Sequence, residues 1–186
     1  MQRDADLLLA TWPEIARGER LLPAGPWREP WSQAGGASAL LLQDASPKVE
    51  LPAPWSALPR IDVGYQPKKL WAWTGGVLKA GPPLSRLKGR QVLALSGLGQ
   101  PARFEASLRG LGASPRSTRF ADHHAFSLEE LQALETRGSA AICTTMKDAM
   151  RLPFQWRPRV PVWVLEAELQ SQPASELNRL IAKLLS

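Results

Sequence analysis

The two histidines of this 186-residue chain, His123 and His124, are adjacent and follow directly after Asp122. A neutral imidazole can accept a proton near pH 7, and a flanking carboxylate can hold the ring in one tautomer. An acid/base site is therefore one interpretation of this triplet. An ordinary surface turn is the other, because Asp and His are common turn residues. Two histidines and one acid without a nearby cysteine do not complete a zinc site, so no metal is predicted.

A glycine-rich turn, Gly97-Leu98-Gly99-Gln100-Pro101-Ala102, lies between a predicted strand and a predicted helix. It matches the G-x-G-x-x-A pattern of nicotinamide dinucleotide sites, and Asp122 lies near the end of the next predicted strand, where a ribose-binding acid would lie. Pro101 argues against this interpretation because it removes one backbone N–H that would bind a pyrophosphate. A NAD-binding oxidoreductase stays an alternative, as does a turn with a purely steric need for glycine.

Apolar segments alternate with helical patterns along the second half of the chain. The strands are predicted at Gln91–Ser96, Arg116–Phe120, Ala140–Thr144 and Val160–Leu165. Helices are predicted after Pro101, after a capping box at Ser127–Glu130, and from Leu177 to Leu185. This alternation is typical of an α/β domain with a parallel sheet and helices on both faces.

The candidate residues follow these strands directly. Gly97 comes after the first strand, Asp122 and His123 after the second, and Thr145 after the third. The carboxyl ends of parallel strands meet at one edge of the sheet, and ligands bind beyond that edge. We therefore expect these residues to converge on one site.

The first half of the chain is rich in proline, glycine and tryptophan. Ala5–Ala10 and Ala39–Gln43 are continuous apolar segments of the kind that form buried strands in parallel sheets. Asp44–Pro59 has four prolines and no regular period, which predicts a loop or linker. Ile61–Tyr65 and Leu70–Thr74 are short alternating segments, the predicted strands of a small connecting ribbon.

Composition sets further limits. The chain is 44% apolar, as globular proteins are, and no apolar run approaches the roughly 20 residues that span a bilayer. Its first residues do not form a secretion signal. The single cysteine, Cys143, fits a reducing compartment and is expected to be an inert core residue. The net charge of +6 suits anionic partners, whether phosphates, nucleic acid or an acidic membrane face, but without a dense basic run the charge alone does not choose among them. No nucleic acid partner is expected.

Four segments, in their order along the chain, resemble the tetraacyldisaccharide 4'-kinase family of lipid A biosynthesis (LpxK). They are residues 21–30 (LLPAGPWREP), 94–104 (ALSGLGQPARF), 120–126 (FADHHAF) and 144–149 (TTMKDA). The resemblance covers nearly the whole chain. It implies a remnant of a P-loop kinase domain, its last strands, plus a linker over residues 1–60. A short connecting β-ribbon over 61–88 and a C-terminal α/β domain over 89–186 follow.

The resemblance also implies roles for individual residues. In the family, a histidine of the Asp-His-His motif works with an aspartate of the nucleotide-binding domain to activate the sugar hydroxyl. His123 is the first candidate for this catalytic role and His124 the second, with Asp122 beside them. Arg28 and Glu29 match the Arg-Glu of a family segment near the substrate cleft and are substrate-binding candidates. A buried structural pair is the alternative for these two residues.

Lys147 is the third substrate-binding candidate. It lies in Thr145-Met146-Lys147-Asp148, which resembles the family's Thr-Glu-Lys-Asp segment with Met146 in place of the acid. In one interpretation Lys147 contacts a phosphate. In the other it pairs with Asp148 on the surface at the start of a helix.

The family's phosphate-binding elements are missing from the sequence. No glycine is followed by Lys and then Ser or Thr, so there is no Walker A loop, and the Walker B region would precede Met1. The family implies ATP and Mg²⁺, but this chain has no loop for the β- and γ-phosphates. Three explanations stay open: a fragment, half of a split kinase with a separate P-loop polypeptide, or a degenerate, non-catalytic binding subunit.

The implied partners are an acylated disaccharide phosphate and ATP. The implied place is cytoplasmic, in peripheral contact with the inner face of the cytoplasmic membrane. Six tryptophans of the first half either face lipid headgroups or pack inside the protein; these are Trp12, Trp27, Trp31, Trp55, Trp71 and Trp73.

Overall fold

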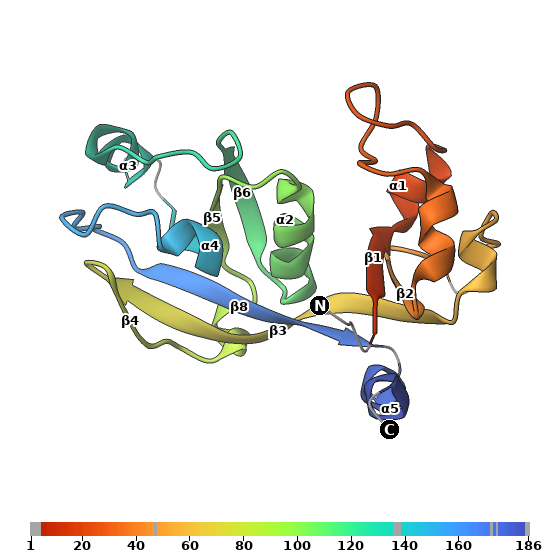
Figure 1. Ribbon diagram of the computed structural model, residues 1–186. Helices are drawn as coiled ribbons and strands as arrows, with labels where there is room; N and C mark the ends of the chain where they lie inside the picture. Colours follow the sequence, from red (N-terminus) through yellow and green to blue (C-terminus); the bar gives the residue numbers. More distant parts are fainter. Residues whose placement is uncertain (1–4, 47, 136–138, 172, 174, 185–186) are drawn as a thin grey trace. The chain divides into compact units, whose positions relative to one another are not determined.

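The computed structural model describes residues 5–46, 48–135, 139–171, 173 and 175–184, and the chain forms two compact units (Figure 1). Unit 1 consists of Met1–Tyr65 with Leu169–Ser186, and unit 2 consists of Gln66–Glu168. Two strands, β3 (Arg60–Thr74) and β8 (Val162–Ser171), each continue from one unit into the other. The domain limits at residues 60 and 88 stay predictions.

Unit 2 is built around a parallel sheet. Strand β5 (Gln91–Ser96) pairs in parallel with β6 (Ser114–Arg119) on one side and with β7 (Ile142–Thr145) on the other. Strand β7 pairs in parallel with β8. Strand β3 and β4 (Val77–Ala80) form an antiparallel hairpin. The predicted α/β class and mostly parallel sheet are confirmed.

The side chains of β5 alternate between two apolar clusters. Val92 lies in the cluster that contains helix α2 (Pro101–Gly110). Leu93 lies in the cluster that contains helices α3 (Leu128–Glu135) and α4 (Met146–Ala149). Successive side chains of a strand point to opposite faces, so these helices cover the sheet from both sides. A continuous apolar strand is the sequence pattern that this arrangement requires.

Local sequence signals set the ends of the helices. Pro101 occupies the first position of α2, where a missing N–H costs nothing. Gly112 follows α2 with a φ of +81°, and its N–H donates to the Arg109 carbonyl at 2.8 Å. Before α3, the Ser127 N–H donates to Glu130 Oε2 at 2.9 Å and the Glu130 N–H donates to Ser127 Oγ at 3.2 Å. The predicted capping box is confirmed.

Unit 1 has its own parallel strands. Strand β1 (Leu7–Thr11) pairs with β2 (Ala39–Gln43), which pairs with the first part of β3. The other elements here are α1 (Trp12–Ala16), η1 (Trp31–Gly36), η2 (Trp55–Ala57) and α5 (Ser175–Leu184), and unit 2 adds η3 (Leu84–Leu87). Residues Leu177 and Leu180 of α5 pack against Leu41 and Ile61. The last residue predicted for this helix, Leu185, lies outside the described residues.

Two expectations for the first half were wrong. Strand β1 is not buried on both faces, because Leu7 is 40% and Leu9 is 49% exposed. The two short ribbon strands are parts of one strand, β3, because its first end pairs with β2 and its second end pairs with β4. Backbone pairing along both ends overrides the polar interruption at residues 66–69.

The tryptophans of the first half are buried or half-buried, so internal packing accounts for them. In unit 1, the rings of Trp27, Trp31 and Trp55 lie against one another, with centroids 5.3 to 5.8 Å apart. Trp55 is 2% exposed and is the centre of this cluster. In unit 2, Trp73 packs on Trp156 at 5.5 Å.

Candidate functional site

The predicted convergence of residues at one sheet edge is confirmed in unit 2. The turn after β5 begins at Gly97, the turn after β6 contains Asp122 and His123, and α4 follows β7 directly. Lys147 Nζ donates to Asp122 Oδ1 at 3.1 Å, which links the second and third of these segments. A Cβ placed on Gly99 would lie 3.7 Å from Asp122 Oδ2, which brings the first segment to the same place.

Asp122 carries a stabilised negative charge. The hydrogen bond from Lys147 is the main cause that lowers the pKa of this carboxyl, and the charge of His123 and its backbone N–H lower it further. Asp122 is thus an anion over the physiological pH range, and it can orient a neighbouring imidazole or repel a second anion.

His123 is held with its side chain outward. Its φ is +61°, in the left-handed region, and its N–H donates to Asp122 Oδ1 at 3.0 Å. The side chain is 73% exposed, and Nε2 lies 3.7 Å from Asp122 Oδ2. An exposed imidazole beside a fixed carboxylate can accept a proton from a bound hydroxyl group.

His124 is tied down by its neighbours. Its ring stacks on Phe120 at 4.5 Å and meets the edge of Phe126 at 5.2 Å. Its Nε2 lies 3.1 Å from Glu130 Oε2. The Ser127 N–H is the main cause of the lowered pKa of Glu130, and the bond with His124 adds to it. With its ring nitrogen engaged, His124 is the less available of the two histidines.

Two charged residues below this turn were not predicted as site residues. Asp148 is fully buried, and Arg151 forms an ion pair with it. Arg151 also donates to the carbonyls of Gly97 and His124, at 3.0 and 3.3 Å. The sequence signal for Asp148 is its spacing from Thr145, which caps α4 by accepting the Asp148 N–H at 3.2 Å. Nothing in the sequence distinguishes Arg151 from the other arginines.

The alternative interpretation of Lys147, a surface pair with Asp148, is wrong. Asp148 points inward because its carboxylate accepts from the Gly97 N–H at 3.2 Å. Lys147 pairs with Asp122 instead. The lysine is therefore part of the charged edge, and its half-exposed side chain can reach an added anion.

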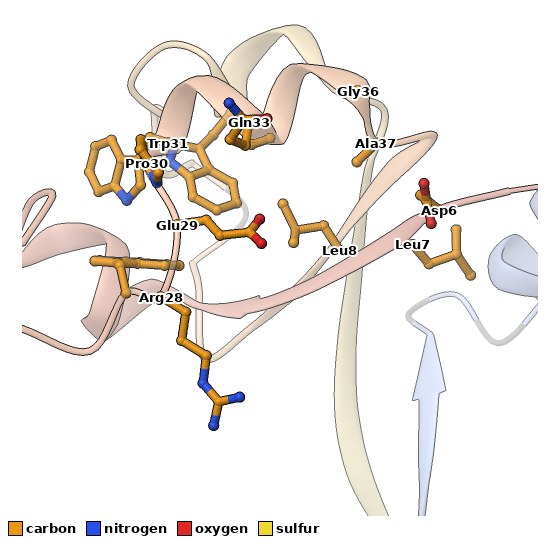
Figure 2. A pocket seen from close by; sticks show the side chains of 13 residues that line it. Asp6, Leu7, Leu8, Arg28, Glu29, Pro30, Trp31, Gln33, Gly36 and Ala37 are labelled. Atoms are coloured by element: carbon orange, nitrogen blue, oxygen red, sulfur yellow. The ribbon is translucent and has the colours of Figure 1, made fainter. Parts of the chain in front are cut away.

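Arg28 and Glu29 belong to unit 1 and lie apart in sequence from the histidine turn. Both side chains are exposed, so the expectation of a buried pair is wrong for them. They line a pocket of about 490 Å³ together with Leu8, Trp31 and Trp55 (Figure 2). In Figure 2 the Glu29 side chain extends toward Leu8, whereas the Arg28 guanidinium extends away from Glu29.

The remaining candidates for chemistry are structural. Cys143 is buried in β7, and burial raises the pKa of its thiol to about 12, as expected for an inert core residue. Among the residues that the structure describes, no three His, Cys, Asp or Glu side chains gather to hold a metal ion. No helix in the described part of the chain is long and apolar enough to cross a membrane.

The fold defines a class: α/β proteins with a mostly parallel sheet, in which ligands typically bind beyond the carboxyl ends of the strands. The chain belongs to the tetraacyldisaccharide-1-P 4'-kinase family (LpxK), whose family model matches residues 1–186.

Curated relatives carry the same name. The chain is 34% identical over 171 residues to the tetraacyldisaccharide 4'-kinase of Gluconobacter oxydans, covering 89% of this chain and 48% of the relative. It is 37% identical over 189 residues to that of Leptothrix cholodnii, covering 99% of this chain and 51% of the relative. The chain thus spans about half the length of these relatives. No solved structure matches the chain.

Proposed function

We propose that this chain is the acceptor-side half of a tetraacyldisaccharide 4'-kinase of lipid A biosynthesis. The whole enzyme would transfer the γ-phosphoryl group of ATP to the 4'-hydroxyl of an acylated disaccharide phosphate. The observation that carries the proposal is the Asp122-His123-His124 turn, which stands at a sheet edge with an outward imidazole in a chain that belongs to this family.

In this proposal His123 is the proton acceptor. It takes the proton of the 4'-hydroxyl as the oxygen of that group attacks the γ-phosphorus and ADP leaves. Asp122 orients the imidazole and stabilises its charged form. Lys147, now paired with Asp122, is placed to contact a phosphate of the incoming substrate. His124 supports the turn through its contacts with Phe120 and Glu130.

The phosphate-binding half is proposed to lie outside these 186 residues, on the same polypeptide or a separate one. The sequence contains no Walker A pattern, so ATP and Mg²⁺ are proposed to bind to that other half. Strand β1 supports the proposal, since it ends the order of strands and exposes Leu7 and Leu9. Parallel strands are normally covered on both faces, so these leucines are the expected contact for the missing half.

The unit 1 pocket is proposed to take part in binding the acceptor through its own residues. Arg28 supplies a guanidinium that can bind a phosphate with two hydrogen bonds, and Glu29 can accept from sugar hydroxyls. The half-buried Trp27 and Trp31 supply the apolar wall on which a sugar ring can lie, and Trp55 supports them from inside. Because the acceptor carries acyl chains, the protein is proposed to contact the inner face of the cytoplasmic membrane, where its net charge of +6 favours anionic lipids.

A chimera tests the function. This chain replaces the corresponding half of the Leptothrix cholodnii relative, and ATP-dependent phosphorylation of a tetraacyldisaccharide 1-phosphate is measured. We expect turnover that needs both halves. A chimera that folds and binds the acceptor without turnover would favour the alternative, a degenerate relative kept as a non-catalytic binding subunit. Tight binding of NAD(H) by this chain would instead favour an oxidoreductase.

A further inference from the structure

A buried ion pair lies beneath the histidine turn, and the proposed reaction does not use it. We propose that Asp148 and Arg151 are positioning residues that hold the turn of residues 121–124 against Gly97 and so present His123 outward. The relevance to catalysis rests on the proposed function, but the geometry can be tested without it.

The Asp148 carboxylate is fixed on both of its oxygens. Oδ1 accepts from the Gly97 N–H at 3.2 Å and from the Arg151 guanidinium, and Oδ2 accepts from Thr145 Oγ1 at 2.9 Å. The residue is fully buried. A buried carboxylate with this many donors is held in one orientation, because the loss of any donor leaves part of a charge unpaired.

The Arg151 guanidinium uses this anchor to join two chain segments. Its Nη2 donates to the Gly97 carbonyl at 3.0 Å, and its Nη1 donates to the His124 carbonyl at 3.3 Å. One planar group therefore binds the turn after β5, the turn after β6 and the Asp148 carboxylate of α4. A lysine ammonium has no planar fork and cannot reproduce this pattern at three separate acceptors.

The space around Gly97 shows how closely these segments meet. A Cβ on Gly97 would lie 3.1 Å from the Ala121 carbonyl oxygen and 3.4 Å from both Arg151 Nη2 and Asp148 Oδ1. Only glycine fits here without a shift of its neighbours. The backbone of the histidine turn is thus in direct contact with the turn after β5. The Asp148–Arg151 ion pair packs against the same glycine.

The left-handed backbone of His123 explains why the turn needs the hydrogen bonds from Arg151. A non-glycine residue at a φ of +61° carries a cost of about 1 kcal/mol or more and persists only where the surroundings impose it. Asp122 imposes it from one side through the His123 N–H, and Arg151 fixes the next carbonyl, that of His124. If that support is lost, the turn relaxes and the direction of the His123 ring changes.

The first experiment uses the chain as it is. Arg151→Lys keeps the charge, Asp148→Asn keeps the shape, and Arg157→Lys is the matched control. Arg157 also donates to backbone carbonyls, but to those of Phe154 and Trp156 in its own segment. Amide exchange at Gly97 and the ring signals of His124, which stacks on Phe120, are followed by NMR.

In the two site variants we expect Gly97 exchange to accelerate about 10-fold or more and the His124 ring signals to move, while core amides of β5 stay protected. The control should change neither. If the site variants match the control, the proposal is overturned. If Arg151→Lys unfolds the chain as a whole, the ion pair is a stabilising element and the positioning role is rejected.

The second experiment measures kinetics in the chimera. Misplacing the proton acceptor should lower kcat by about 10- to 100-fold in Arg151→Lys, with KM for the acceptor within about twofold. Unchanged kcat despite altered NMR signals would separate the turn from catalysis and reject the positioning role in the reaction. An inactive chimera with no substitution would reject the proposed function instead, and the NMR result would still decide the geometry.

Discussion

The histidine turn of unit 2 and the tryptophan-lined pocket of unit 1 are stabilised by different kinds of interaction. The turn is held by charges: Lys147 on Asp122 above, and Arg151 on the fully buried Asp148 below. The pocket is held by aromatic packing around Trp55, and its charged residues Arg28 and Glu29 are exposed.

This difference suggests a division of labour. Charged cross-links fix a backbone to a fraction of an ångström, which a proton transfer needs. An apolar wall with exposed charges tolerates small movements of a ligand, which binding allows. We therefore expect substitutions at the turn to act on turnover, and substitutions at the pocket to act on affinity or on folding.

The largest expected effect is a loss of turnover, and it tests the catalytic role of the histidine turn. In the chimera, His123→Ala should lower kcat by about 10²- to 10⁴-fold and raise KM much less, because a general base acts chiefly in the transition state. His123→Asn is the better variant, since Asn tolerates the left-handed backbone that His123 adopts and removes only the imidazole. Steady-state phosphorylation of the acceptor is the measurement.

His124 provides the matched comparison. His124→Ala should cost less turnover, because its ring is already engaged by Phe120 and Glu130. Near-normal turnover of His123→Asn would remove His123 from the mechanism. A larger loss in His124→Ala would transfer the role to the second histidine.

The next effect concerns the pocket's aromatic wall. Trp55→Ala removes a side chain that is 2% exposed and should destabilise unit 1 by about 3 to 5 kcal/mol. Urea unfolding followed by tryptophan fluorescence measures this loss. Leu22→Ala, at a 58% exposed apolar position of the same unit, is the control and should change the free energy of unfolding little. Equal effects of the two substitutions would mean that the aromatic cluster does not support the pocket.

A smaller effect tests whether a charged pair away from the histidine turn also stabilises unit 2. Glu105 of α2 is buried, and its hydrogen bonds with Arg119 lower its pKa from 4.5 to about 2. Because the folded-state pKa is lowered, this stabilisation is complete above pH 4.5 and is lost as the pH falls to about 2. The loss amounts to about 3 kcal/mol at most.

Acid unfolding of the wild type and of Glu105→Gln measures this contribution. The variant has no carboxyl to titrate, so its stability should depend less on pH over this window. Parallel pH profiles for the two proteins would contradict the pKa shift.

Most of the histidine turn and of the elements around it could be predicted from the sequence. The apolar strands at Gln91–Ser96 and Ala140–Thr144 and the cap at Ser127–Glu130 are local patterns, and local patterns predict local structure. The convergence of Asp122 and His123 at one edge followed from the parallel order of the strands.

The support below the turn could not be predicted in this way. Arg151 acts on carbonyls that are 54 and 27 residues away in sequence, at Gly97 and His124, and such contacts leave no periodic signal. The length of β3 was missed for the same reason, because its central residues are polar and its pairing partners are distant. For β1, the sequence predicted burial on both faces. The burial of Leu7 and Leu9 depends on which elements cover the strand, and an apolar pattern does not show this.

The smallest expected effect is a loss of acceptor affinity, and it tests the binding role of the unit 1 pocket. Arg28→Ala in the chimera should raise KM for the acceptor about 10-fold with little change in kcat, because a hydrogen bond from a charged group contributes about 1.5 kcal/mol or more. Arg17→Ala, an exposed arginine of the same unit outside the pocket lining, should leave both constants unchanged. Arg28→Lys keeps the charge without the planar fork and should fall between the two. A loss confined to kcat would show that Arg28 acts in the transition state, and the division between a catalytic turn and a binding pocket would then be wrong.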